Sequence, residues 1–133
     1  MGQKPLKILI VEDNSLNMML LRDILSLNDY EIIEAVTGAE AIRHVAEDSP
    51  DIVLMDLHLP VMDGITATRI LKADESFRDI PVLAITAAAS SMDVEEILSM
   101  GFDGCVTKPI EMERLLAEVR RCAGEGKEDG ASD

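Results

Sequence analysis

Ile52-Val53-Leu54-Met55-Asp56 is an unbroken apolar run that ends in a carboxylate. Three other short apolar runs also end in polar or charged side chains: Ile8-Leu9-Ile10-Val11-Glu12-Asp13, Val82-Leu83-Ala84-Ile85-Thr86 and Gly104-Cys105-Val106-Thr107-Lys108-Pro109. Apolar runs without polar alternation are typical of parallel strands buried on both faces. If the four runs are neighbours in one sheet, three carboxylates, one hydroxyl and one ammonium group meet at the same edge.

Segments of helical period alternate with these runs. We expect strands at 6–11, 31–35, 51–56, 80–86 and 103–106, and helices at 16–27, 37–47, 65–73, 91–100 and 110–122. Strands that alternate with helices predict an α/β fold, in which helices cover both faces of a parallel sheet. The strand at 31–35 is the weakest and is expected near an edge. Ligands of such sheets bind outside the carboxyl ends of the strands, which is where the reactive side chains of this chain are found.

The first and last predicted helices each carry apolar residues at helical spacing. The residues expected to face the core are Leu16, Met19, Leu20, Ile24 and Leu27 in the first helix, and Met112, Leu115, Leu116 and Val119 in the last. Asn14 or Ser15 caps the start of the first helix. Because only 2% of the residues are aromatic, the core must be aliphatic.

Length and composition limit the function. The chain has 133 residues, enough for one domain, which we place at 1–123; the glycine-rich, charged segment 124–133 is expected to be a disordered acidic tail. The net charge of -14 argues against sequence-independent binding of nucleic acid and against an anionic membrane surface. Cys105 and Cys122 lack CxxC or metal-ligand spacing, so we expect a reduced, cytoplasmic protein, with a disulfide between them as the alternative.

The carboxylates predict a metal site. Glu12, Asp13 and Asp56 would repel one another and raise each other's pKa unless a cation lay among them. Their hard oxygen atoms suit Mg²⁺, with Mn²⁺ as the second choice. The alternative is that Glu12 and Asp13 form a polar turn which, with Asn14, only caps a helix. That alternative weakens because Asp56 ends a second strand.

The remaining candidates suit phosphoryl chemistry. Asp56 is the candidate nucleophile, because a carboxylate can accept a phosphoryl group as an acyl phosphate. Lys108 can pair with Asp56 or with a phosphoryl oxygen, and a cis bond to Pro109 would aim it into the site. The Thr86 hydroxyl and nearby backbone N–H groups can meet another phosphoryl oxygen. Taken singly, each has a simpler alternative: a solvated loop aspartate, a solvated lysine in a turn and a threonine packed in its strand.

The histidines are weaker candidates. His58 lies two residues after Asp56 and would serve as a phosphohistidine or general base, although a loop histidine without a function is the simpler alternative. His44 is expected on an exposed helix face. Neither has a Cys or His partner at metal-ligand spacing.

Four motifs, in this order and spacing, resemble those of bacterial response-regulator receiver domains. They are Ile10-Val11-Glu12-Asp13-Asn14, Met55-Asp56-Leu57-His58-Leu59-Pro60-Val61-Met62-Asp63-Gly64, Ile80-Pro81-Val82-Leu83-Ala84-Ile85-Thr86-Ala87 and Thr107-Lys108-Pro109-Ile110. The resemblance spans residues 6–122. It implies a flavodoxin-like, doubly wound (βα)5 fold whose five-stranded parallel sheet has the order 2-1-3-4-5.

The same resemblance implies the role of each site residue. Asp56 would accept the phosphoryl group from a phosphohistidine on a histidine kinase or a histidine phosphotransfer protein. The groups implied to hold Mg²⁺ are Asp13, Asp56 and the backbone carbonyl of His58, with Glu12 acting through water. The groups implied to bind the phosphoryl oxygens are Thr86, Lys108 and the backbone N–H of Ala87.

Two departures from the family pattern bear on signalling. Family members usually carry Tyr or Phe three residues before the lysine, as a switch coupled to the threonine that corresponds to Thr86; this chain has Cys105 there, so no aromatic switch is available. The positions that help to set the lifetime of the phosphoryl group are His58 and Ala88, and Ala88 has no group to orient a water. Fast dephosphorylation would therefore depend on a partner phosphatase or on His58.

Several functions remain open at this point. The leading one is a receiver that is not itself an enzyme, and that signals to an unknown downstream protein through its 91–100 helix, 103–106 strand and last helix. It would be a stand-alone, DivK-like receiver and a monomer. Two variants remain open: a dimer formed through the last two helices, and a receiver cut from a hybrid kinase. The alternatives are a pseudo-receiver that binds partners without phosphorylation, and an aspartyl phosphohydrolase. A flavodoxin is disfavoured because carboxylates follow the first strand where a phosphate loop would be needed.

Overall fold

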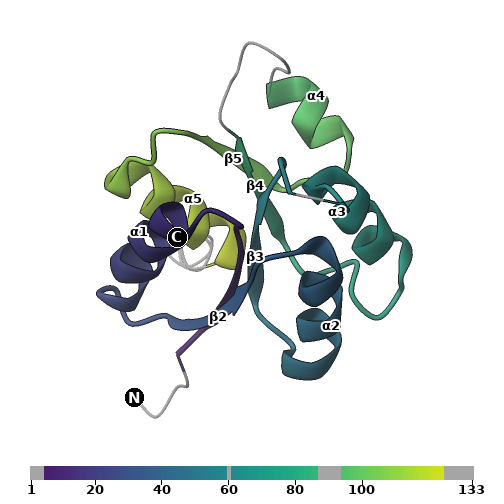
Figure 1. Cartoon of the computed structure of the whole chain (residues 1–133), viewed down its shortest axis with the longest axis horizontal. Helices are drawn as coiled ribbons and strands as arrows, with labels where there is room; N and C mark the ends of the chain where they lie inside the picture. Colours follow the sequence, from purple (N-terminus) through teal and green to yellow (C-terminus); the bar gives the residue numbers. More distant parts are fainter. Residues whose placement is uncertain (1–4, 60, 87–93, 125–133) are drawn as a thin grey trace, which may run out of the picture.

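The computed structural model describes residues 5–59, 61–86 and 94–124. A central five-stranded sheet lies between two layers of helices (Figure 1). The elements in chain order are β1 (Lys7–Val11), α1 (Ser15–Ser26), β2 (Glu31–Ala35), α2 (Gly38–Asp48), β3 (Ile52–Asp56), α3 (Gly64–Ala73), β4 (Val82–Thr86), α4 (Val94–Ser99), β5 (Gly104–Thr107) and α5 (Met112–Ala123). All neighbouring strands pair in parallel, in the order β2-β1-β3-β4-β5. The predicted flavodoxin-like fold is confirmed, with β2 at an edge as expected.

Each face of the sheet has its own apolar core, because successive residues of a strand point to opposite sides. In β1, Ile8 and Ile10 pack with α1 and α5, whereas Leu9 and Val11 pack with α2 and α3. Figure 1 shows α1 and α5 on one side of the sheet and α2 and α3 on the other. Phe102 is the only aromatic residue among the buried ones that the structure describes, so the core is aliphatic as predicted.

Parts of the predictions fall where the structure describes nothing. These are the start of the helix predicted at 91–100, the backbone of Ala87 and residues 125–133 of the predicted tail. The division into a domain and a tail therefore stays a prediction. Neither Cys105 nor Cys122 forms a disulfide, so the alternative of a disulfide between them is wrong. None of the helices described here has the length and apolar character needed to cross a membrane.

Of the predicted apolar residues at helical spacing in α1, only Ile24 is buried. The buried residues of this helix are Met18, Leu21, Ile24 and Leu25. Of the predicted set, Leu16, Met19, Leu20 and Leu27 are exposed, by 42% to 82%. Two overlapping apolar stripes run along α1, and the sheet covers only one of them, so periodicity alone could not select the buried one. Met112 of α5 was also assigned to the core and is 53% exposed.

One ammonium group ties α3 to the amino-terminal edge of the sheet. Lys72 Nζ donates to the carbonyl oxygens of Arg78 (3.1 Å) and Ile80 (3.0 Å) and to Asp103 Oδ2 (2.9 Å). The same carboxylate oxygen accepts the backbone N–H of Val82, the first residue of β4, at 2.8 Å. Lys72 therefore joins the end of one helix to the starts of β4 and β5, on the side of the sheet opposite the reactive residues.

We expect Lys72→Met to lower the free energy of unfolding by roughly 1–3 kcal/mol, because it removes charge-assisted hydrogen bonds to three acceptors. Urea denaturation measures the change. Arg69→Met, at an exposed position on the same helix, is the matched control and should change stability by less than about 0.5 kcal/mol. Equal effects of the two substitutions would contradict the stabilising role assigned to Lys72.

Candidate functional site

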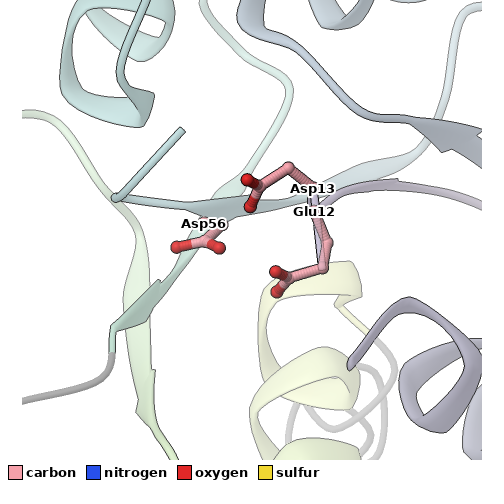
Figure 2. Close-up of side chains that lie close together, drawn as sticks. All are labelled: Glu12, Asp13 and Asp56. Carbon is pink, nitrogen blue, oxygen red and sulfur yellow. The ribbon is translucent and has the colours of Figure 1, made fainter. Parts of the chain in front are cut away.

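Three carboxylates meet at the carboxyl edge of the sheet (Figure 2). Glu12 and Asp13 directly follow β1, and Asp56 is the last residue of the neighbouring β3. One oxygen of each carboxylate lies within 4.8 Å of the others. Glu12 and Asp56 are buried, with exposed fractions of 1% and 2%, whereas Asp13 is open to solvent. In the part of the chain that the structure describes, this is the only cluster of three or more His, Cys, Asp or Glu side chains arranged to hold a metal ion.

The turn after β1 fixes Glu12. Its backbone N–H donates to the carbonyl of Ala35 at 3.0 Å, which extends the pairing with β2. Its carboxylate folds back, and Oε2 accepts the backbone N–H of Asn14 at 3.2 Å. The side chain of Asn14 then caps α1 by accepting the N–H of Asn17 at 2.9 Å. The cap that the sequence suggested is thus real, but it accompanies the acidic cluster and does not replace it.

Asp56 is held through both of its carboxylate oxygens. Oδ1 accepts the backbone N–H of His58 at 2.9 Å, and Oδ2 lies 3.4 Å from Lys108 Nζ. Gly64, the first residue of α3, lies against the backbone of Asp56, and a Cβ atom there would overlap the Asp56 carbonyl oxygen. A glycine is therefore required at this position. Gly64 lies one residue before the helix predicted at 65–73, and the only sequence signal for this contact is a glycine directly after Asp63, the residue that caps the helix.

Lys108 bridges the two buried carboxylates. Its Nζ lies 3.3 Å from Glu12 Oε1 and 3.4 Å from Asp56 Oδ2. Its backbone N–H donates to the carbonyl of Thr86 at 2.7 Å, and the bond to Pro109 is cis, as the sequence suggested. The Thr86 side chain is buried at the end of β4. The ammonium group, the hydroxyl-bearing residue and the acidic cluster therefore gather at one edge, as the strand ends predicted.

The other candidate residues differ in how far they are exposed to solvent. His58 is exposed beside Asp56, so its ring can reach solvent. His44 was expected to be exposed, but it is half-buried on α2, where Nδ1 lies 2.7 Å from Asp48 Oδ2. The carboxylate four residues further along the helix explains the difference, because the two side chains lie on the same face. Cys105 is buried in β5.

The electrostatics of the site favour a bound cation. The pKa of Glu12 is raised to about 7, mainly by burial and then by the neighbouring Asp56 carboxylate, and the Asn14 N–H and the charge of Lys108 offset these effects only in part. Glu12 Oε1 is buried and, although Lys108 approaches it, has no hydrogen-bond partner. A buried anionic oxygen left without a hydrogen bond is costly. The donor set, three carboxylates with one side open to water, fits Mg²⁺, which binds through one or two carboxylates and keeps several waters.

Comparison with known proteins agrees with this geometry. The family model of the response regulator receiver domain matches residues 8–120. The chain therefore belongs to the receiver domain family of response regulators, the phosphoacceptor domains of two-component signal transduction. It is 41% identical over 118 residues to the polar-differentiation response regulator DivK of Brucella ovis, a match that covers 89% of this chain and 96% of that protein.

Solved structures show the same fold. The receiver domain of the sensor histidine kinase PA1611 from Pseudomonas aeruginosa, with a magnesium ion in its active site cleft, matches with a TM-score of 0.83 and 34% identity, covering 90% of this chain and 98% of that one. A co-crystal structure of the Saccharomyces cerevisiae phosphotransfer protein Ypd1 with the receiver domain of Ssk1 gives a match with a TM-score of 0.81 and 28% identity, covering 90% of each chain.

We expect the metal-free protein to lose stability as the pH rises from about 4.5 to above 7. Between these values the folded protein holds a proton on Glu12 that the unfolded chain has released, so the free energy of unfolding falls as the pH rises through the folded pKa of about 7. Over this pH range the free energy of unfolding of the wild type should fall by roughly 1–3 kcal/mol more than that of Glu12→Gln. Urea denaturation in EDTA at several pH values measures it. Parallel pH profiles of the two proteins would show that Glu12 carries no such proton.

Proposed function

We propose that Asp56 accepts a phosphoryl group in a Mg²⁺-dependent reaction, and that the chain signals through protein contacts that depend on this modification. The observation that carries the proposal is the placement of Asp56: its carboxylate lies beside Asp13 and Glu12 on one side and Lys108 on the other. An in-line phosphoryl transfer requires acidic oxygens that bind a cation, and it also requires an ammonium group. Both must lie next to the same nucleophile.

The donor would be a phosphohistidine of a histidine kinase or a histidine phosphotransfer protein. An Asp56 oxygen attacks phosphorus and forms the P–O bond of an acyl phosphate. The P–N bond breaks, and its electron pair returns to the protonated imidazole, which leaves as a neutral ring. Lys108 is freed from its contact with Asp56 Oδ2 and neutralises charge on the phosphoryl oxygens, to which the Thr86 hydroxyl and the backbone N–H of Ala87 donate hydrogen bonds.

Asp13, Asp56, the backbone carbonyl of His58 and, through water, Glu12 would hold the metal ion. When bound, Mg²⁺ supplies positive charge against the transferring group; Mn²⁺ would serve as well. The protein provides positioning and charge for its own modification and is not an enzyme acting on a separate substrate. We place it in the cytoplasm with its kinase, acting as a monomer on the domain assigned to residues 1–123.

The exposed stripe of α1 supports a protein donor. Leu16, Met19 and Leu20 are exposed apolar residues, and the helix that carries them begins two residues after Asp13. A phosphohistidine that reaches Asp56 must bring its own protein against this edge of the sheet. An apolar surface next to the reactive carboxylate is suited to such docking.

Phosphorylation would change the output surface through Thr86. The added phosphoryl oxygens attract its hydroxyl, and Thr86 ends β4 beside Thr107 of β5. Because Cys105 replaces the aromatic residue that usually accompanies this movement in the family, we infer that the signal leaves the domain through α4 and α5 without an aromatic rotamer change.

We expect intact mass spectrometry to detect one added phosphoryl group after incubation with acetyl phosphate and Mg²⁺, and no adduct with EDTA. Asp56→Asn removes the nucleophile and should abolish the adduct. Asp13→Asn should weaken it strongly, because it removes a proposed metal ligand.

Asp51→Asn is the matched control, since Asp51 flanks the opposite end of β3, where it accepts the backbone N–H of Lys7. It should leave phosphoryl uptake unchanged. An absent adduct in a folded protein that also fails to bind beryllofluoride would favour a pseudo-receiver. Steady release of phosphate from many equivalents of donor would instead indicate a phosphohydrolase.

We expect His58→Ala to slow the loss of the phosphoryl group, because His58 is the exposed ionisable side chain next to Asp56 and Ala88 cannot orient a water. The rate constant of this loss should fall by about 10²-fold, the lower end of the range for a group that assists proton transfer. Decay of the phosphorylated protein, followed by mass, measures it. His44→Ala, at a histidine paired with Asp48 on α2, is the control; identical decay of wild type and His58→Ala would remove His58 from the reaction.

A further inference from the structure

The segment that joins β3 to α3 is held at both of its ends. At its start, the Leu57 N–H donates to the carbonyl of Ile85 at 3.0 Å, and the His58 N–H donates to Asp56 Oδ1 at 2.9 Å. At its end, the Gly64 N–H donates back to the Leu57 carbonyl at 3.2 Å. The backbone carbonyl of His58, proposed above as a ligand of the metal ion, lies within this closed segment. Its position therefore depends on how the residues between the two ends are held.

Val61, inside the same segment, has a backbone conformation that its side chain disfavours. Its φ is 67°, in the left-handed region that β-branched residues rarely adopt. The side chain is fully exposed, so packing of Val61 itself does not compensate for this conformation. Strained residues of this kind persist only where the surrounding structure enforces them, and they gather at functional sites. A contact made by a neighbouring residue must therefore hold Val61.

That contact is made by Met62, which rests on the start of α2. The helices α2 and α3 pack side by side on one face of the sheet (Figure 1). A Cβ atom on Gly38, the first residue of α2, would lie 3.0 Å from the Cγ, the Sδ and the backbone oxygen of Met62, so a larger residue there would push Met62 away. The start of α2 is firmly held, since Thr37 Oγ1 accepts the Glu40 N–H at 3.0 Å and Glu40 Oε1 accepts the Val36 N–H at 2.9 Å. Met62 is thus fixed against a rigid support.

We propose that the contact of Met62 with Gly38 holds Val61 in its left-handed conformation and so positions the His58 carbonyl for Mg²⁺. The inference deepens the proposed function and rests on it in one respect, that this carbonyl is a metal ligand. Val61, Met62 and Gly38 do not bind the ion in this arrangement; they are positioning residues. A ligand that is already in place need not be ordered when the ion binds, so the contact raises the affinity for Mg²⁺.

The first test removes the contact. We expect Met62→Ala to weaken Mg²⁺ binding about tenfold, the lower end of the effects seen when groups that support metal ligands are removed. Isothermal titration calorimetry of the metal-free full chain with MgCl₂ measures the affinity, and urea denaturation in EDTA measures the stability. Met100→Ala is the matched control, because Met100 is also half-buried and packs against the same apolar core. It should lower the urea midpoint in a similar way and leave the Mg²⁺ affinity unchanged; equal weakening by both would overturn the proposal.

The second test restores the conformation without the contact. Asparagine adopts the left-handed region more readily than valine, and the side chain of Val61 is fully exposed. Val61→Asn alone should therefore keep the Mg²⁺ affinity and raise the urea midpoint. Combined with Met62→Ala, it should restore most of the lost affinity, which a loss of core packing at Met62 would not allow. Absence of this rescue would overturn the proposal.

Gly38→Ala tests the other side of the contact and serves if Met62→Ala does not fold. The added Cβ atom displaces the backbone oxygen of Met62, so Mg²⁺ binding should weaken as it does in Met62→Ala; an unchanged affinity would overturn the proposal. Phosphoryl uptake from acetyl phosphate is measured on the same preparations. Mg²⁺ binding that follows the expected pattern without any uptake would support this inference and refute the phosphoacceptor function. A wild type that binds no Mg²⁺ would overturn both.

Discussion

The burial of carboxylates beside one another at one sheet edge is the constraint on which the rest of the site depends. Glu12 and Asp56 are both buried, and the carboxylate of Asp13 lies beside them. Lys108 supplies one positive charge for the two buried groups. Burial and the neighbouring Asp56 nevertheless raise the pKa of Glu12 to about 7, so that near neutral pH a proton compensates part of the negative charge. A divalent cation would take over the role of that proton. In the proposed reaction the site would therefore bind a cation first, and a group rich in negative oxygens only after the cation is bound.

The strand order brings these charged groups together without long loops. Adjacent parallel pairing of β1 with β3 places two acidic strand ends side by side, and β4 and β5 bring Thr86 and Lys108 to the same edge. No long loop is needed to position them, since each reactive residue is at, or within two residues of, the end of a rigid strand. Gly64 completes the arrangement by letting α3 start directly against the backbone of Asp56. Rigid placement of this kind is what a reaction governed by positioning and charge requires.

The sequence predicted what depends on local pattern and on strand ends. Runs such as Ile52–Asp56 specify both a buried parallel strand and the residue at its reactive end, so the fold, the strand order implied by the resemblance and the gathering of the charged groups followed. The buried face of α1 did not follow, because Met18 and Leu21 compete with Met19 and Leu20 and only tertiary packing decides between them. The half-burial of His44 and the need for Gly64 depend on contacts across space, which spacing along the chain does not contain.

Two exposed surfaces of the domain lie at different places around the sheet. The apolar stripe of α1 lies beside the acidic edge, whereas a cleft over Cys105 is lined by α4, β5 and the side of α5 that carries Arg114 and Arg121. A donor protein on α1 and a downstream partner at α4 and α5 would contact different residues. The hydrogen bond from the Lys108 N–H to the Thr86 carbonyl joins β4 to the end of β5 between these two surfaces. If phosphorylation at Asp56 changes the affinity of the α4 and α5 surface for a partner, binding of that partner must change the stability of the phosphorylated state by the same free energy. Such a partner would then act on the lifetime of the signal as well as receive it.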